Sequence, residues 1–414
     1  MVKKVLIICI AGLFASGFVW ANPVKKTIQV GGFTREYLVY TPQNPQKEKA
    51  DGMIIGLHGF SRTMYDFFEE YNVSAVADSL NLIIVAPQAL EEQNPSVKLE
   101  ADLINLFTDE KLSLNSVWGC GLKFYAFSKL LETTLLAEEL NRDVDDVDFI
   151  NKLIDDVLYD YSLPDENIFI LGTSMGGYMA YKYALKNGER LSGLISVAGS
   201  MGLAVKGMEY LIKTPVCDFH SVTDEVVHYY NFIEKELDIG FVRDSITICL
   251  ARSKSSVINY WTETNLTGTP VTEQVQYYPS TNGITVEKIT YPDPVNGNEV
   301  IHYKMNGSSH SYFFRKENGD CMDYIEEITK FIGSHLSDPF NSVPDITAQK
   351  VGFYPNPVRD KIYFETTNGI VSIFDIAGRK IFSQQFSSGQ ADLSFLKPGV
   401  YMVKIDGETY KRYC

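Results

Sequence analysis

The sequence predicts an α/β fold with a mostly parallel central sheet, followed by a small all-β domain. Near-continuous apolar runs at 53–57, 82–86 and 168–171 are typical of strands buried on both faces, and segments with helical spacing separate them. Strands that alternate with helices indicate right-handed crossovers and a parallel sheet. Beyond residue 350, the chain contains only short alternating runs with glycines between them.

Composition and charge exclude several classes of protein. The chain has 414 residues, of which 45% are hydrophobic and 21% charged, so it is globular and long enough for two or three domains. The formal net charge of −15, with no block of Lys or Arg, argues against a nucleic-acid partner. We expect no cofactor and no metal: the acidic cluster at 143–148 invites a calcium interpretation, but it lacks a calcium-loop glycine and runs straight into a helix.

The first 21 residues are typical of a secretory signal. Lys3 and Lys4 precede an apolar stretch over 5–20, and the small residue Ala21 is the expected cleavage position. No later segment is long and apolar enough to span a bilayer, so we expect a secreted or cell-surface protein without a transmembrane segment. Export permits disulfides, and four cysteines could form two bridges in any of three connectivities: Cys120, Cys217, Cys249 and Cys321.

The remaining elements follow in chain order. An antiparallel hairpin with a Gly31-Gly32 turn is expected at the start, and the long segment 88–141 is interpreted as an insertion over the edge of the sheet. Helices are expected at 67–80, 147–161, within 229–265 and at 324–336, and strands at 191–198, 216–220 and across a β-rich region at 271–303. We therefore predict an α/β domain at 22–336, a linker at 337–349 and a β-sandwich-like domain at 350–414.

One stretch carries the chemistry. The apolar run at 168–171 leads into Gly172-Thr173-Ser174-Met175-Gly176, after which helical spacing resumes. A strand, a tight turn and a helix form the setting of a nucleophile elbow, in which small glycines leave the hydroxyl of Ser174 exposed at the tip of the turn. The motif therefore predicts a reactive serine.

A serine nucleophile needs a base, and the base needs a carboxylate. In the α/β-hydrolase fold they follow in the order Ser, Asp or Glu, His, which Asp224 and His310 satisfy from polar loops after strands. Asp218 and Glu225 are alternative acids. The other histidines are expected to be structural: His58, His220, His228, His302 and His335.

The oxyanion of the tetrahedral intermediate needs two preorganised donors. The amide of Met175 is one, and the amide of Phe60, in the loop after the first central strand, is the other. We interpret His58 as a residue that braces this loop. Aromatic side chains are abundant, and Trp118, Trp261 and Tyr312 are candidate substrate contacts.

Together these motifs resemble the polyhydroxybutyrate depolymerase and feruloyl esterase family of secreted esterases. The resemblance rests on the segments at 31–37, 57–59 and 145–150, the elbow, His220-Ser221-Val222-Thr223-Asp224 and His310, and it covers most of residues 25–336. It implies a carboxylic-ester hydrolase with Ser174 as nucleophile, Asp224 as acid and His310 as base. Two positions depart from the family pattern: Ser221 replaces a glycine, and Ser311-Tyr312-Phe313 replaces a Trp-Pro pair.

The C-terminal segment resembles the sorting domain of the type IX secretion system. The motifs are Tyr354-Pro355-Asn356-Pro357, the stretch at 373–379 and the stretch at 396–401. The resemblance implies that the secretion machinery is a partner and that the chain passes through the outer membrane. A carbohydrate-binding sandwich is the alternative interpretation of the same strand pattern.

These observations favour a secreted serine esterase. Feruloyl or acetyl esters of plant polysaccharide are the first expected substrates, and a polyhydroxyalkanoate or another polyester is the second. A peptidase with the same fold is a catalytic alternative. A non-catalytic surface binding protein on a hydrolase scaffold is an alternative of another class.

Overall fold

The computed structural model describes thirteen segments of the chain: residues 23–43, 49–107, 113–128, 133–203, 212–230, 239–243, 246–337, 353–354, 360–364, 369–374, 380–396, 401–405 and 408–411. The chain divides into two compact units, Met1–Ser337 and Asp338–Cys414. The expected signal peptide lies outside the described residues, as does nearly all of the expected linker.

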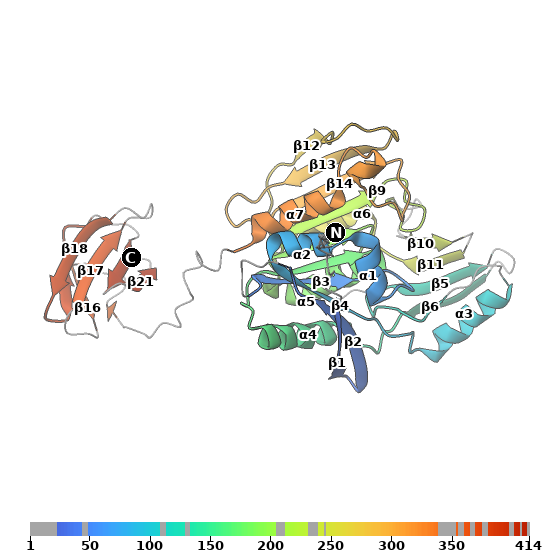
Figure 1. Ribbon diagram of the computed structural model, residues 1–414, viewed down its shortest axis with the longest axis horizontal. Helices are drawn as coiled ribbons and strands as arrows, with labels where there is room; N and C mark the ends of the chain where they lie inside the picture. The colour runs from blue at the N-terminus through green and yellow to red at the C-terminus, as the bar shows by residue number, and fades with distance from the viewer. Residues whose placement is uncertain are drawn as a thin grey trace, which may run out of the picture. The chain divides into compact units, whose positions relative to one another are not determined.

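The first unit is built on a ten-stranded sheet in the order β1-β2-β4-β3-β7-β8-β9-β14-β13-β12 (Figure 1). The six strands from β4 to β14 are parallel, and antiparallel strands flank them on both sides. The strands are β1 Val24–Val30, β2 Phe33–Tyr40, β3 Gly52–Leu57, β4 Leu82–Pro87, β7 Ile168–Thr173, β8 Gly193–Val197, β9 Val216–Ser221, β12 Val271–Gln274, β13 Thr285–Tyr291 and β14 Val300–Asn306. The expected mostly parallel sheet is confirmed.

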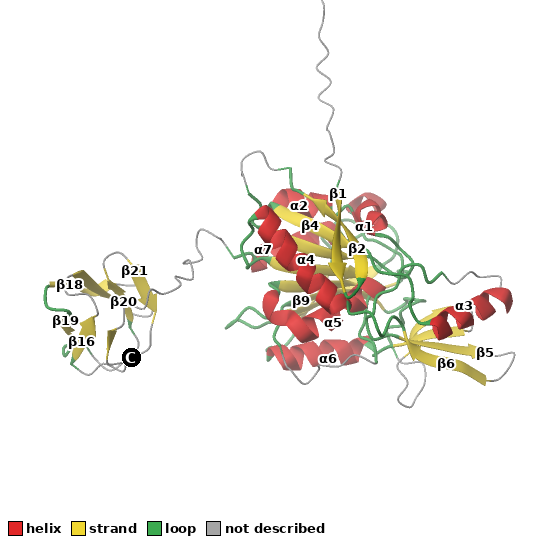
Figure 2. Ribbon diagram, turned by 90° about the horizontal axis from the view of Figure 1, so that it is seen from below, coloured by secondary structure: helices red, strands yellow, loops and turns green. Residues whose placement is uncertain are grey.

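Helices cover both faces of this sheet (Figures 1 and 2). Helices α4, α5 and α6 pack on one face, and α1, α2 and α7 pack on the other. Their bounds are α1 Met64–Tyr71, α2 Ser74–Leu80, α4 Asp146–Tyr161, α5 Met175–Asn187, α6 Lys254–Asn265 and α7 Tyr324–His335, with short 3-10 turns at Gly188–Arg190 and Lys316–Asn318. Successive side chains of β3 enter the two cores alternately, which explains why its sequence is apolar throughout. This arrangement is the α/β-hydrolase fold.

Two segments expected to be helical contain more elements than the sequence indicates. The single helix expected at 67–80 is split into α1 and α2, because Asn72 adopts a left-handed conformation with φ of 47° between them. Within the described residues of 229–265, α6 confirms the expected helix near the end of the segment, and the strands β10 Ile239–Arg243 and β11 Ile246–Leu250, which were not expected, precede it. The β-branched residues of 239–250 suit strands better than a helix.

These two strands belong to a second, four-stranded antiparallel sheet in the order β10-β11-β5-β6. The segment 88–141 supplies the other two, β5 Lys123–Ser128 and β6 Thr133–Glu139, and also helix α3 Pro95–Phe107. The expected insertion therefore has regular structure of its own, and it shares a sheet with a segment about a hundred residues later in the chain.

The cysteine expectation is wrong. Among the described side chains, Cys120, Cys217 and Cys321 are unpaired thiols, and each is buried. The two expected bridges among Cys120, Cys217, Cys249 and Cys321 would require all four. Burial raises the pKa of Cys120 to about 12, so its sulfur remains a neutral thiol that fills the core.

The acidic cluster at 143–148 has structural partners. Asp145 caps α4 by accepting from the amide of Asp148, and Asp146 is buried. One oxygen of Asp146 accepts from Arg35 at 2.7 Å, and the other accepts from the amide of Gly119 at 2.7 Å. The guanidinium of Arg35 also lies 3.8 Å from the ring centroid of Phe149. Asp146 thus ties the opening hairpin to α4.

The second unit contains two small antiparallel sheets, β15-β16-β19 and β18-β17-β20-β21. The strands are β15 Phe353–Tyr354, β16 Lys361–Phe364, β17 Gly369–Phe374, β18 Lys380–Phe386, β19 Gln390–Asp392, β20 Met402–Ile405 and β21 Glu408–Lys411. Ile362, Val371, Ile373 and Val403 are among the buried residues of its own apolar core. Across the described residues of both units, helices long and apolar enough for a membrane span are absent.

We predict that Asp146→Ala destabilises the first unit by about 3 kcal/mol, because it leaves the buried Arg35 charge without its partner. Asp148→Ala is the matched control: this residue forms an exposed pair with Lys152 on the same helix, and its loss should cost less than about 1 kcal/mol. Urea unfolding measures both values. Equal stability of the two variants would contradict the assignment of Asp146 as a buried tie.

Candidate active site

Ser174 lies between the end of β7 and the start of α5, in a backbone conformation that few non-glycine residues adopt. Its φ and ψ are 51° and −119°. Such a conformation costs on the order of 1–3 kcal/mol and persists only where the surroundings enforce it. Here the amide of Ser174 donates to the carbonyl of Val197 on the neighbouring strand at 2.8 Å. The turn therefore places the serine side chain at the carboxyl edge of the parallel strands.

Glycines make this sharp turn possible. A Cβ on Gly172 would overlap the carbonyl of Gly176, and a Cβ on Gly176 would overlap the carbonyl of Leu57 on β3. Helix α5 can therefore begin directly against two strands only because both positions lack a side chain. The elbow predicted from the sequence is present in the structure, with each glycine at a close backbone approach.

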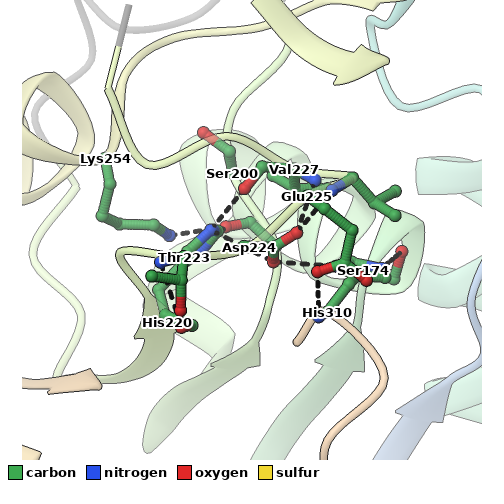
Figure 3. A network of polar contacts seen from close by, with 12 residues as sticks. Ser174, Ser200, His220, Thr223, Asp224, Glu225, Val227, Lys254 and His310 are labelled. Atoms are coloured by element: carbon green, nitrogen blue, oxygen red, sulfur yellow. Dashed lines mark hydrogen bonds and ion pairs between the residues drawn. The ribbon is translucent and has the colours of Figure 1, made fainter. Parts of the chain in front are cut away.

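The structure brings Ser174 together with His310 and Asp224 (Figure 3). The Nε2 atom of His310 lies 2.9 Å from the Oγ of Ser174, and its Nδ1 lies 2.8 Å from Oδ2 of Asp224. The His310 side chain is 11% exposed and that of Asp224 is fully buried. A nucleophile, a base that can take its proton and a carboxylate that orients the base are thus aligned.

The carboxylate of Asp224 is held on its other side by its own loop. Its Oδ1 accepts from the amides of Val226 and Val227, both at 2.8 Å. Burial opposes its negative charge, but the hydrogen bond and charge of His310, assisted by the backbone amides, outweigh this effect, so the pKa of Asp224 is lowered from its ordinary value. Asp224 is therefore ionised and fixed, as a residue that orients a base must be.

The two alternative acids have different partners. Asp218 is buried in β9, where it accepts from Lys254 at 2.8 Å and lies 2.8 Å from Nδ1 of His302. Burial opposes its charge, yet Lys254 and His302 hold the pKa of Asp218 well below its ordinary range. Glu225 is exposed, and its Oε2 accepts from the backbone amide of His310 at 3.1 Å. Of the three acids, only Asp224 contacts the imidazole of His310 in the described structure.

The other histidines have separate contacts. His302 binds Asp218 and the hydroxyl of Tyr229, and His335 contacts two backbone carbonyls around α7. His220 is buried beneath Asp224, with its Nε2 2.7 Å from the carbonyl of Val227. Burial, aided by the charge of Lys254, lowers the pKa of His220 to about 4, so this imidazole is neutral. His228 follows in the same loop and is partly buried.

His58 braces the loop after β3. Its Nδ1 lies 2.8 Å from the carbonyl of Gly59, and its Nε2 accepts from the amide of Ala89 at 3.1 Å. These contacts assign the proton to Nδ1. Burial lowers the pKa of His58 to about 4, which agrees with a neutral ring. A Cβ built on Gly59 would lie 3.4 Å from the Cβ of Ser174, so this loop runs directly past the nucleophile.

The expected aromatic substrate contacts are largely wrong. Trp118 and Trp261 are both 0% exposed, so neither indole is accessible to a substrate. Trp118 instead donates from Nε1 to the carbonyl of His58 at 2.9 Å, and Trp261 stacks on Tyr181. Tyr312 is partly exposed, but its hydroxyl donates to Asp320 at 2.8 Å. Aromatic content alone does not reveal burial, and the sequence offered no other signal.

The sequence prediction missed the contacts that surround the three central residues. Ser221, Thr223 and Glu225 of the acid loop bind the backbone of the loop that carries His310. Lys254 is a fully buried cation beneath that site. One signal pointed to such a partner: Asp218 stands within an apolar strand, and a buried carboxylate requires a counterion or donor.

Comparisons with known families give two matches. Residues 137–236, which contain the Ser174 turn and the Asp224 loop, match the family of phospholipases and carboxylesterases. Residues 352–413 match the secretion system C-terminal sorting domain. The sorting domain indicates a secreted or cell-surface protein. The first match covers about a quarter of the chain and shows that this part of the first unit is similar to phospholipases and carboxylesterases. The finer expectation of a feruloyl esterase or a polyhydroxybutyrate depolymerase stays a prediction.

A comparison with curated proteins finds no match. Among solved structures, an acetyl xylan esterase from Aspergillus awamori has 11% identity and a TM-score of 0.47, and the match covers 75% of this chain and 99% of that one. An S-formylglutathione hydrolase from Agrobacterium tumefaciens has 13% identity and a TM-score of 0.42, with 76% and 95% covered. The fluorophosphonate-binding serine hydrolase FphF from Staphylococcus aureus has 12% identity and a TM-score of 0.40, with 77% and 99% covered. With TM-scores below 0.5, what these proteins act on carries no argument about this chain.

We predict that Gly176→Ala destabilises the protein by about 2 kcal/mol or more, because the added methyl group overlaps the carbonyl of Leu57 and either β3 or α5 must shift. Gly268→Ala is the matched control, since the nearest atom to its added Cβ lies at 3.5 Å. Thermal and urea unfolding compare the two. A Gly176→Ala protein as stable as the control would mean that the close approach is not needed to form the turn.

Proposed function

We propose that this protein is a secreted serine esterase that uses Ser174 as nucleophile, His310 as general base and Asp224 as the orienting acid. The observation that carries the proposal is the continuous relay from the Ser174 hydroxyl through the His310 imidazole to the Asp224 carboxylate, with contacts of 2.9 and 2.8 Å. The match to the carboxylesterase family supports ester hydrolysis as the reaction.

The relay suggests how the ester is cleaved. Ser174 Oγ attacks the carbonyl carbon while Nε2 of His310 takes the hydroxyl proton, and Asp224 stabilises the imidazolium that results. The tetrahedral intermediate collapses, and His310 gives the proton to the departing alcohol. Water then enters, His310 removes its proton, and attack on the acyl-enzyme releases the carboxylic acid and restores Ser174.

The oxyanion of both intermediates is assigned to the amides of Met175 and Phe60. The amide of Met175 is at the N-terminus of α5, where unpaired N–H groups and the helix dipole favour negative charge. Phe60 follows Gly59, which passes next to Ser174. Each such donor is worth roughly 3 kcal/mol of barrier.

The proposed substrates are feruloyl or acetyl esters of plant polysaccharide, with polyhydroxyalkanoates and other polyesters as the alternative. This assignment rests on the sequence resemblance to secreted esterases of those two kinds. The C-terminal sorting domain supports it, because a large insoluble substrate must be met outside the cell. We propose that the type IX secretion machinery recognises this domain.

We predict that the wild-type protein hydrolyses p-nitrophenyl acetate and is labelled by a fluorophosphonate, whereas Ser174→Ala loses labelling and at least about 10³-fold in kcat. Ser334→Ala, an exposed serine on α7, is the control and should retain both. Running the assay with methyl ferulate and with a poly(3-hydroxybutyrate) film separates the two substrate classes. Equal rates for Ser174→Ala and wild type would eliminate the serine mechanism, and an unlabelled, inactive wild type would favour the binding-protein alternative.

A second prediction distinguishes the role of Asp224 in catalysis from the role of Asp218 in stability. Asp224→Asn should lower kcat by about 10⁴-fold with little change in stability, because the asparagine no longer fixes the charge and tautomer of His310. Asp218→Asn should instead destabilise the protein by about 3 kcal/mol, because Lys254 loses its buried counterion. Steady-state kinetics and urea unfolding of both variants check this pattern. The reverse pattern would assign the acid role to Asp218.

A further inference from the structure

We propose that the acid loop, residues 221–227, also positions the base, through the side chains of Ser221, Thr223 and Glu225. This inference rests on the proposed function, because it concerns the placement of His310 against Ser174. The three side chains reach across to residues 307–310, the base loop, and bind its backbone at Gly307, Ser308 and His310 (Figure 3 shows Thr223 and Glu225 beside the relay). They are positioning residues, since each acts on His310 through the backbone of the base loop and none acts on a substrate.

The two loops are adjacent because the strands before them pair in parallel. Ser221 ends β9 and is paired with Met305 of β14, so the segments that follow these two strands leave the sheet at the same edge. The amide of Val222 still donates to the carbonyl of Met305 at 2.8 Å. Beyond this bond the pairing between β9 and β14 ends, and Gly307 turns the chain with φ of +97°. Side chains of the acid loop therefore make the next contacts.

The two hydroxyl groups have a consistent hydrogen-bond assignment. Thr223 Oγ1 accepts from the amide of Gly307 at 3.1 Å and donates to the carbonyl of Ser308 at 2.9 Å. Ser221 Oγ accepts from the amide of Thr223 at 3.2 Å and donates to the same carbonyl at 2.7 Å. A carbonyl oxygen has two lone pairs, so Ser308 can accept both bonds. Both hydroxyl groups thus donate their hydrogen to the carbonyl of Ser308. These bonds fix the base loop two residues before His310.

Glu225 acts on His310 directly. Its Oε2 accepts from the backbone amide of His310 at 3.1 Å, while the neighbouring residue Asp224 holds the imidazole at 2.8 Å. One short loop thus contacts both the main chain and the ring of the base. A hydrogen bond from an amide to a carboxylate is stronger than one to a neutral acceptor, which helps it persist at an exposed position.

Such a clamp matters because the imidazole must satisfy two distances at once. A displacement of about 1 Å in a catalytic group can cost on the order of 10²-fold in rate. Asp224 alone can hold one ring nitrogen, but the direction of the other nitrogen toward Ser174 also depends on where the main chain of residue 310 lies. The clamp fixes that main chain. Its loss should therefore reduce the chemical step more than substrate binding.

The test compares removal of each bonding group with a replacement that retains it. Thr223→Val and Glu225→Ala should each lower kcat and the rate of fluorophosphonate labelling by about tenfold, with KM for p-nitrophenyl acetate changed less than twofold. Thr223→Ser and Glu225→Gln keep a hydroxyl and an acceptor oxygen, and should return to within about threefold of wild type. Thr329→Val is the control: it removes a hydroxyl that bonds only within α7, and its kcat should equal that of wild type.

Thermal unfolding of each variant distinguishes positioning from folding, since Thr223 and Glu225 are exposed and their replacement should leave the unfolding midpoint close to that of wild type. If Thr223→Val does not fold, the Glu225 pair still decides the question. An active wild type with Thr223→Val and Glu225→Ala at wild-type kcat would overturn the clamp alone. A fall in kcat that Ser and Gln do not restore would also overturn it. A wild type that neither hydrolyses esters nor is labelled would overturn the proposed function as well.

Discussion

The backbone of Ser174 is the constraint on which the rest of the site depends. A strand must end and a helix must begin within one residue, and Ser174 takes the unfavourable dihedral angles that this requires. The strain is sustained because Gly172 and Gly176 allow α5 to lie against β7 and β3 at backbone distance. With a side chain at either glycine, the helix would move outward and take the serine with it. The position of the nucleophile is thus set by close main-chain packing, and such close-packed interiors resist compression.

The base and acid depend on a second constraint, the parallel pairing of β9 and β14. This pairing places Asp218 opposite His302 in the sheet and the loops of Asp224 and His310 together above them. Lys254 of α6 donates to Asp218 and also to the carbonyl of Gly199, which lies 3.1 Å from Nδ1 of His220. A buried ion pair adds little net stability over an apolar pair. In the observed register both Lys254 and His302 contact Asp218, and the two loops leave the sheet at the same edge.

The sequence was most informative where a rule of topology applies. Chain order and the common edge of parallel strands were enough to select Ser174, Asp224 and His310. His310 contacts Ser174, which lies 136 residues earlier in the chain, and Asp224, which lies 86 residues earlier. The apolar strands were equally clear, because burial on both faces leaves a continuous apolar run. Prediction failed where side chains of the same residue type can occupy different environments. Nothing in the sequence distinguishes a core indole from a cleft indole, or a thiol from half of a disulfide. The strands at 239–250 were missed for another reason, because their β-branched residues were a signal that the helical spacing of the wider segment obscured.

The contacts of Trp118 show how one of these failures bears on the mechanism. This indole holds the carbonyl of His58, while the His58 ring holds the carbonyl of Gly59. In a planar trans peptide, the carbonyl of Gly59 and the amide N–H of Phe60 point in opposite directions. Because His58 Nδ1 donates to that carbonyl, the Phe60 N–H is turned away from the imidazole, in a loop whose Gly59 already lies against Ser174. The buried tryptophan and the neutral histidine thus act together to orient one peptide group, which supports the assignment of Phe60 as an oxyanion donor. Trp118, which the sequence suggested as a substrate contact, is instead a buried residue that holds the loop after β3.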